Sequence, residues 1–175
     1  MTHTVNATTG STGAGKGGKY LTFALGKEQY GLAILKVREL IGYMDLTCVP
    51  RMPAHVKGVI NLRGQVISVI DLRTKFGMEP VARTEETCII IVEIEDNGRR
   101  MPCGLIVDRV SEVLNITNES IEDPPSLGKS VRMDFIVGMG KVGETVKILL
   151  DIDKVLSNAD VVAMGEVLNN TAKAA

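Results

Sequence analysis

The sequence predicts an all-β fold in which two similar small barrels account for most of the chain. Short runs rich in Val, Ile and Leu recur from residue 19 onward, and glycines separate many of them. Helical patterns are few and short, and two stretches of strand pattern repeat later in the chain. Many short strands with few helices are typical of β-sandwiches and small barrels.

Apolar runs bounded by glycine, proline or polar residues are predicted as strands. They span residues 19–25, 30–41, 56–62, 65–70, 87–94, 101–114, 135–139 and 145–150. Asp71 and Asp151 each follow such a run and begin a short helical pattern. An Asp side chain there accepts hydrogen bonds from the free backbone amides of a first helical turn. We therefore expect short helices within residues 71–77 and 151–156.

An internal repeat divides the strand-rich region into two halves. Residues 31–40 share their apolar pattern with residues 104–113 at a shift of 73. The end of the run 66–72 matches residues 148–152 at a shift of 80, which places Gly58 on Gly138. A duplicated unit packs against its own copy or intertwines with it. We expect halves at about 19–80 and 86–156.

Both ends of the chain are predicted to lie outside the domain of residues 19–157. Residues 1–18 contain mainly Thr, Gly, Ser, Ala and Asn, which bury too little apolar surface to order a chain. Residues 10–17 come close to a phosphate-binding loop, but Gly17 stands where a hydroxyl is required and no strand precedes it. We interpret residues 1–18 as a flexible tail and residues 158–175 as a C-terminal helix and tail.

The charge balance excludes several classes of partner. Twenty Lys and Arg face 21 Asp and Glu, so the net charge is −1, and Trp is absent. Nucleic-acid binding needs surplus positive charge and stacking side chains, so we expect no nucleic-acid partner. No apolar stretch approaches 18 residues and no basic, apolar leader opens the chain. We expect a cytoplasmic protein with no direct membrane insertion.

Three cysteines offer an enzymatic alternative. Cys48, Cys88 and Cys103 are an odd number at wide spacing, and His3 and His55 are the only histidines. Neither a disulfide framework nor a metal site follows, and we expect no cofactor. The simplest interpretation places the thiols in the core or in turns. The alternative is a small thiol-dependent enzyme using Cys88 or Cys48 with His55.

One predicted strand carries a carboxylate within an apolar row. Alternation along residues 35–41 places Leu35, Val37, Glu39 and Ile41 on one face. The repeat has Val110, Glu112 and Leu114 in the same arrangement. Two interpretations stay open: a glutamate at a barrel rim or paired with an arginine of the fold, and an apolar recognition face with a charged specificity element.

A second feature is the sequence Asn61-Leu-Arg63-Gly64 between two predicted strands. Gly64 permits a tight hairpin, and Asn61 is placed to satisfy backbone groups of the turn. An arginine fixed on a hairpin is also a good anchor for the carboxylates or carbonyl groups of a partner.

Taken together, four segments resemble the family of bacterial chemotaxis coupling proteins, the CheW-like adaptors. They are residues 23–39, 49–58, 58–73 and 104–114, and the resemblance extends over about residues 19–156. It implies two five-stranded barrels of Src-homology-3-like form and no catalytic activity. It also implies an adaptor that joins the cytoplasmic tips of methyl-accepting chemotaxis receptors to the regulatory domain of the histidine kinase CheA, at receptor arrays on the inner face of the membrane.

The resemblance also implies site residues. Receptor-binding positions of the family fall on Val37, Glu39, Gly58 and Arg63. Kinase binding falls on the second half, around Gly104 and Val110, and on the loop after residue 121, where Glu122 and Asp123 add negative charge. No catalytic or metal-binding residue is implied.

Overall fold

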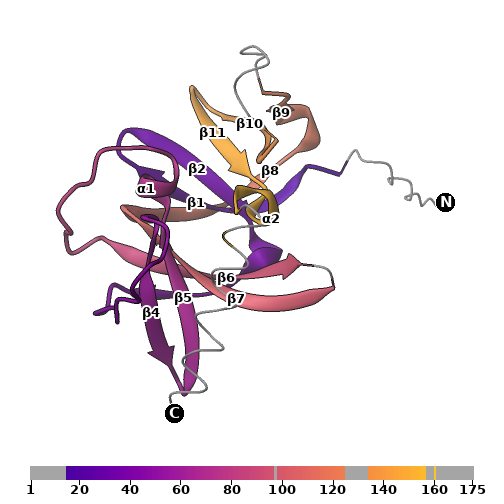
Figure 1. Cartoon of the computed structure of the whole chain (residues 1–175). Helices are drawn as coiled ribbons and strands as arrows, with labels where there is room; N and C mark the ends of the chain where they lie inside the picture. The colour runs from indigo at the N-terminus through magenta and orange to yellow at the C-terminus, as the bar shows by residue number, and fades with distance from the viewer. Residues whose placement is uncertain (1–14, 97, 125–133, 157–159, 161–175) are drawn as a thin grey trace.

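The strands form two sheets that lie one above the other in Figure 1. The computed structural model describes residues 15–96, 98–124, 134–156 and 160. The strands are β1 (Gly18–Leu25), β2 (Glu28–Ala33), β3 (Val37–Gly42), β4 (Val56–Leu62), β5 (Gln65–Asp71), β6 (Cys88–Asp96), β7 (Arg99–Val107), β8 (Arg109–Ile116), β9 (Ile121–Glu122), β10 (Ile136–Val142) and β11 (Thr145–Leu150). The helical elements are the 3-10 turns η2 (Ile34–Lys36) and η3 (Asn118–Ser120) and the short helices α1 (Leu72–Lys75) and α2 (Ile152–Val155).

The two sheets have matching strand orders and exchange strands between the repeat halves. One sheet runs β8-β1-β2-β11-β10, with the two-residue β9 at its edge, and the other runs β3-β6-β7-β5-β4. Replacing each strand by its repeat counterpart converts one five-strand order into the other. The first hairpin of each half, β1–β2 or β6–β7, therefore lies in the sheet formed by the later strands of the other half. The predicted all-β class is confirmed, and the halves are intertwined.

Two predicted strands are interrupted at corresponding places. The expected strand 30–41 is divided by η2, and the expected strand 101–114 is divided at Asp108. At each break the chain leaves one sheet for the other, β2 to β3 or β7 to β8. The predictions missed these crossovers because the apolar pattern continues through them.

The short helices begin where the sequence predicts. Asp71 caps α1 by accepting a hydrogen bond from the amide of Arg73 at 2.9 Å, and Asp151 caps α2 through the amide of Asp153 at 3.1 Å. The C-terminal helix predicted within residues 158–175 and residues 1–14 of the predicted N-terminal tail lie outside the described residues, apart from Asp160. At the described end of that tail, Gly18 already begins β1, and Lys16 contacts Asp123 at 3.0 Å.

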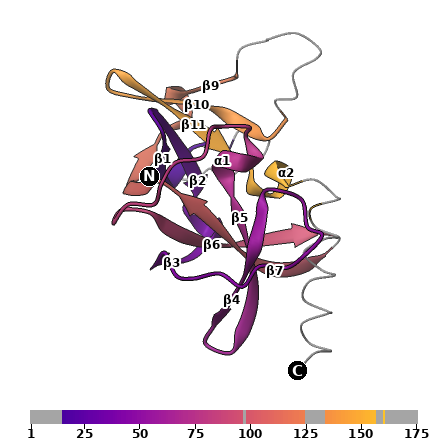
Figure 2. The same ribbon diagram turned by 60° about the vertical axis from the view of Figure 1, so that its left-hand side comes forward.

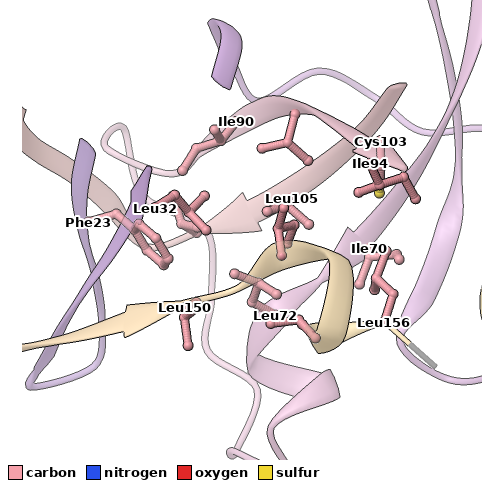
Figure 3. Close-up of a cluster of buried hydrophobic side chains, with 14 of the residues drawn as sticks. Phe23, Leu32, Ile70, Leu72, Ile90, Ile94, Cys103, Leu105, Leu150 and Leu156 are labelled. Carbon is pink, nitrogen blue, oxygen red and sulfur yellow. The ribbon is translucent and has the colours of Figure 1, made fainter. Parts of the chain in front are cut away.

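The main core fills the space between the two sheets (Figure 3). Its side chains come from both halves, because the exchanged hairpins bring them together. Buried members include Phe23, Leu32, Ile70, Leu72, Ile90, Ile94, Cys103, Leu105, Leu150 and Leu156. A smaller cluster around Ile60 and Ile91 lines the five-stranded sheet, and another around Tyr20 and Leu149 lines the six-stranded sheet.

An ion pair joins three segments at what we call the first junction. Arg73 of α1 donates to both carboxylate oxygens of Asp108, at 2.8 and 2.7 Å, where the chain crosses from β7 to β8. The amide of Gly26, in the β1–β2 turn, donates to the same carboxylate at 2.7 Å. The bonds to Arg73 hold the pKa of Asp108 below its usual range, and the amide of Gly26 adds to this effect.

The second half has a corresponding junction with the charges reversed, which we call the second junction. Here the helix carries the carboxylate: Asp153 of α2 accepts from Lys36 of η2 at 2.7 Å. Its other oxygen accepts from the amide of Glu95, near the end of the β6–β7 hairpin, at 2.9 Å. Each junction thus ties one hairpin, one crossover and one short helix together.

Breaking the first junction is expected to destabilise the whole domain. Arg73→Met leaves the Asp108 carboxylate without its main partner at a site where both side chains are largely buried, so we expect a loss of about 2 to 4 kcal/mol in the free energy of unfolding. Urea unfolding measures this loss. Arg109→Met, at an exposed neighbouring residue, serves as the matched control, and equal losses for both variants would contradict the assignment.

The depressed pKa of Asp108 also predicts a pH dependence with a defined sign. A carboxyl whose folded-state pKa lies below its unfolded value stabilises the fold above about pH 4, and this stabilisation disappears as the pH falls through the folded pKa. Asp108→Asn should lower stability at pH 7 and remove this part of the acid sensitivity. Thermal melts between pH 7 and pH 2 measure both effects, and an Asn variant with the acid profile of the wild type would contradict the prediction.

Candidate protein-binding site

Two of the predicted receptor-binding residues contact each other across the two edges of the five-stranded sheet. Glu39 lies on β3 at one edge, and Arg63 lies in the turn after β4 at the other. The Arg63 Nη2 atom donates to Glu39 Oε2. The structure therefore combines the two interpretations of Glu39: it is paired with an arginine of the fold, and the pair lies at the surface.

The hairpin turn fixes the backbone of Arg63. Leu62 pairs with Gln65, which leaves Arg63 and Gly64 as a two-residue turn with φ of 52° and 86°. Positive φ at both positions is the turn geometry that matches the twist of β-hairpins, although it is unusual for arginine. Asn61 Oδ1 accepts from the Gly64 amide at 2.9 Å, as predicted for a turn-stabilising residue. The hairpin tip projects at the lower end of the molecule in Figure 2.

The pair borders a shallow depression of about 180 Å³ on this edge of the protein. Its lining consists of Arg38, Glu39, Leu62, Arg63, Gln65, Ile67 and Ile91. The Arg63 side chain is 71% exposed and that of Glu39 is 30% exposed, so the guanidinium keeps donors facing solvent while the carboxylate is half-buried. This arrangement can accept polar groups of a protein partner.

The apolar row predicted with Glu39 is only partly correct. Val37 packs against the main core and Ile41 against the smaller cluster, because the ladder between β3 and β6 shifts register between residues 37 and 39. Leu35 does not belong to the row, because it lies in η2 and is 94% exposed. The sequence pattern gave no signal of that exposure, since Leu35 has the spacing of a core residue.

Gly58 is buried in β4, and its close packing gives it a structural role. Its backbone lies under Thr47, which exchanges two 2.9 Å hydrogen bonds with Val59. A Cβ atom on Gly58 would lie 2.3 Å from the carbonyl oxygen of Thr47, and its φ of 149° also favours glycine. Gly58 therefore lets residue 47 pair with β4 beneath the hairpin that carries Arg63.

The two predicted kinase-binding residues differ in exposure, because Gly104 is buried and Val110 is half-buried. Gly104 is buried in β7, where a Cβ atom would lie 2.9 Å from Ile89 and 3.2 Å from Val69. Val110 is half-buried and packs against the main core. Gly104 thus packs closely between its neighbouring strands, and Val113, 49% exposed on the same strand as Val110, is the accessible apolar residue nearby in sequence.

The thiols do not have the environment of activated nucleophiles. Cys103 is buried, and burial raises its pKa to about 12. Burial also raises the pKa of the half-buried Cys88, whereas a catalytic thiol needs a lowered pKa. His55 Nε2 contacts the buried carboxylate of Asp160, which Lys75 also binds at 2.6 Å. The described part of the chain brings no three His, Cys, Asp or Glu side chains together as a metal site.

The second half lacks the counterpart of the surface pair. Glu112 corresponds to Glu39 at a shift of 73 and is exposed on β8. The residue that corresponds to Arg63 at a shift of 80 is Gly143, followed by Glu144. The charged pair is thus a property of one half of the duplicated fold.

Within the described residues, no helix is long and apolar enough to span a membrane.

Comparison with known proteins gives consistent matches over most of the chain. The family model described as CheW-like domain matches residues 19–160. The chemotaxis protein CheW of Klebsiella aerogenes is 39% identical over 151 residues, which cover 86% of this chain and 89% of that protein. CheW of Treponema pallidum is 31% identical over 144 residues, covering 80% and 82%. The crystal structure of the scaffolding protein TtCheW from Thermoanaerobacter tengcongensis has a TM-score of 0.71 and 36% identity, covering 82% and 95%.

Gly58→Ala is expected to destabilise the protein by about 1 to 3 kcal/mol, because the new methyl group meets the Thr47 carbonyl and the φ of 149° becomes strained. Gly42→Ala is the matched control, since no atom lies within 4 Å of a Cβ there. Chemical unfolding of both variants measures the difference. A Gly58 variant as stable as the Gly42 variant would overturn the structural role.

The thiol environments predict an order of reactivity. At pH 8 an aromatic disulfide reagent should modify the exposed Cys48 first and Cys88 more slowly, while Cys103 should react only as the protein unfolds. Single-cysteine variants followed by absorbance give the three rates. Rapid modification of Cys88 at pH 6 would instead indicate an activated thiolate and revive the enzymatic alternative.

Proposed function

This chain belongs to the CheW-like family, and we propose that it acts as a non-catalytic adaptor that couples the cytoplasmic tips of chemoreceptors to the histidine kinase CheA. The observation that carries this proposal is the surface pair of Glu39 and Arg63, a charged pair at the rim of a small, mainly polar depression on one half. The relatives named as chemotaxis and scaffolding proteins match over most of their length, which favours the same role for the whole chain.

The proposed receptor face consists of the surface pair and the depression beside it. Arg63 supplies exposed donors for carbonyl or carboxylate groups of the receptor tip, and Glu39 fixes the guanidinium and offers its second oxygen. Gly58 contributes indirectly by keeping residue 47 close under the hairpin. Val37 supports the start of β3 from the core side.

The proposed kinase face lies on the second half, on the exposed side of β8. The intertwined duplication places a similar sheet there but without the charged pair, so the two faces differ in chemistry. Val110 anchors the strand in the main core, while Val113 and Glu112 are exposed on it. The kinase regulatory domain would meet this surface, which leaves the receptor face free. An adaptor of this kind works on the cytoplasmic side of the membrane, at receptor arrays.

Co-elution tests the adaptor proposal directly. The full chain is mixed with a receptor-tip fragment, with the kinase regulatory domain, and with both, and each mixture is separated by size exclusion. We expect complexes with each fragment and a ternary complex with both. Failure to bind either fragment at micromolar concentrations would overturn the proposal.

Charge exchange tests the receptor face more sharply. Glu39→Arg and Arg63→Glu each place like charges side by side and should weaken receptor binding about tenfold or more, with little change in kinase binding. The double variant restores an opposite-charge pair and tests whether pairing alone suffices. Partial recovery indicates that the pair orients the face, and loss without recovery indicates direct contacts of the original charges. Unchanged binding in all three folded variants would contradict the assignment.

The proposed kinase face is tested with Val113→Asp, which adds a charge at a 49% exposed position and leaves the core packing unchanged. We expect weaker binding of the kinase fragment and unchanged binding of the receptor fragment, measured by separate titrations. Equal weakening of both partners in a folded variant would show that the two faces overlap.

A further inference from the structure

Leu35 is the most exposed of the large hydrophobic residues in the described part of the chain. It is 94% exposed, whereas the other exposed large hydrophobics range from 37% to 57%. It precedes Lys36, whose side chain is fixed in the second junction, and it follows Ile34, which packs against the main core. Single exposed leucines are common on protein surfaces. Leu35 differs from such residues in that its two anchored neighbours hold it in this exposed position.

The fold itself does not require an exposed side chain at this position. In the duplicated half, residue 108 corresponds to residue 35, and the Asp108 side chain there is turned inward to accept from Arg73 and Gly26. At the crossover that contains residue 35, the carboxylate of the junction comes instead from Asp153 on α2 of the second half. Residue 35 therefore does not have to supply the carboxylate of the junction, and its side chain is available for another contact.

The backbone presents Leu35 in a fixed position. Residues 34–36 form the 3-10 turn η2, which the amide of Val37 closes by donating to the carbonyl of Ile34. Lys36 holds the turn to α2 at 2.7 Å. An apolar side chain on a rigid turn loses little backbone freedom when it binds, and this favours its use as an anchor.

The surroundings of Leu35 connect it to the receptor face. Leu35 and Lys36 of η2 line a depression of about 210 Å³ together with Glu93, Ile94 and Glu95 of β6, which pairs with β3, and Arg100 of β7. The depression at the surface pair begins at Arg38, three residues after Leu35 on the same edge of the sheet. Leu35 and Glu39 therefore belong to one continuous edge of the protein.

We propose that Leu35 is an apolar anchor of the receptor face, an inference that rests on the proposed function and extends it. Two 3-10 steps and two strand steps separate Leu35 from Glu39 by about 11 Å along the chain. Two turns of an α-helix span nearly the same length. The partner segment that fits is an amphipathic helix that receives Leu35 between apolar side chains and offers polar groups to Glu39 and Arg63 about seven residues away.

The test titrates a fluorescent receptor-tip fragment with the full chain and its variants. Leu35→Asp should lower the affinity at least tenfold, Leu35→Ala severalfold, and Leu35→Met should bind nearly as the wild type does. Val146→Asp is the matched control, because Val146 is a 47% exposed apolar residue on the second half. It should bind the receptor fragment normally. Thermal melts of the four variants should coincide with the wild type, and all should bind the kinase fragment equally.

The possible outcomes separate this inference from the proposed function. If Leu35→Asp binds the receptor fragment normally while Arg63→Glu does not, the anchor is overturned and the adaptor function stands. If Leu35→Asp loses the kinase fragment instead, Leu35 belongs to a different face and the inference is also overturned. If the wild type binds neither fragment, both proposals fail together.

Discussion

The exchange of hairpins between the two sheets depends on the ionic junctions at which a short helix, a crossover and a hairpin meet. In the first junction the helix carries the cation, Arg73, and the crossover carries the anion, Asp108. In the second the helix carries the anion, Asp153, and the crossover carries the cation, Lys36. Both carboxylates also accept from a hairpin amide, so the same three segments are joined with either polarity. At each junction the fold requires a pair of opposite charges whose carboxylate can also accept a hydrogen bond from a hairpin amide. It does not require a particular residue at either position.

The exchange has a second requirement, which is close approach between strands of different halves. β2 runs parallel to β11, and β7 runs parallel to β5. At each contact one strand contributes a glycine: a Cβ on Gly31 would lie 2.8 Å from Leu149, and one on Gly104 would lie 3.2 Å from Val69. The main core takes side chains from both halves, so neither half encloses it alone. The duplicated sequence therefore specifies one cooperative unit.

The sequence was sufficient to predict the strands, the capped short helices and the duplication, because these depend on local periodicity, on Asp71 and Asp151, and on the repeat itself. It was not sufficient to predict which sheet each strand joins, since a crossover at Asp108 leaves the apolar pattern unbroken. For the site, Glu39 and Arg63 were both identified, but their contact depends on the two edges of a curved sheet approaching each other. The burial of Gly58 and the exposure of Leu35 depend on tertiary packing, which the residue type alone does not predict.

Comparison of the two halves separates the features that the shared architecture requires from those that differ between the halves. The strand orders, the register shift at Gly58 and Gly138, and the capped helices are shared, so these serve the architecture. Arg63 corresponds to Gly143, and Leu35 corresponds to Asp108, so charge and apolar surface differ at the two positions that flank β3. An arginine at a φ of 52° costs conformational energy that Gly143 avoids at a φ of 61°. The first half accepts this cost at a solvent-exposed tip, where glycine would suit the turn better, because only an arginine side chain at this position supplies the ion pair with Glu39.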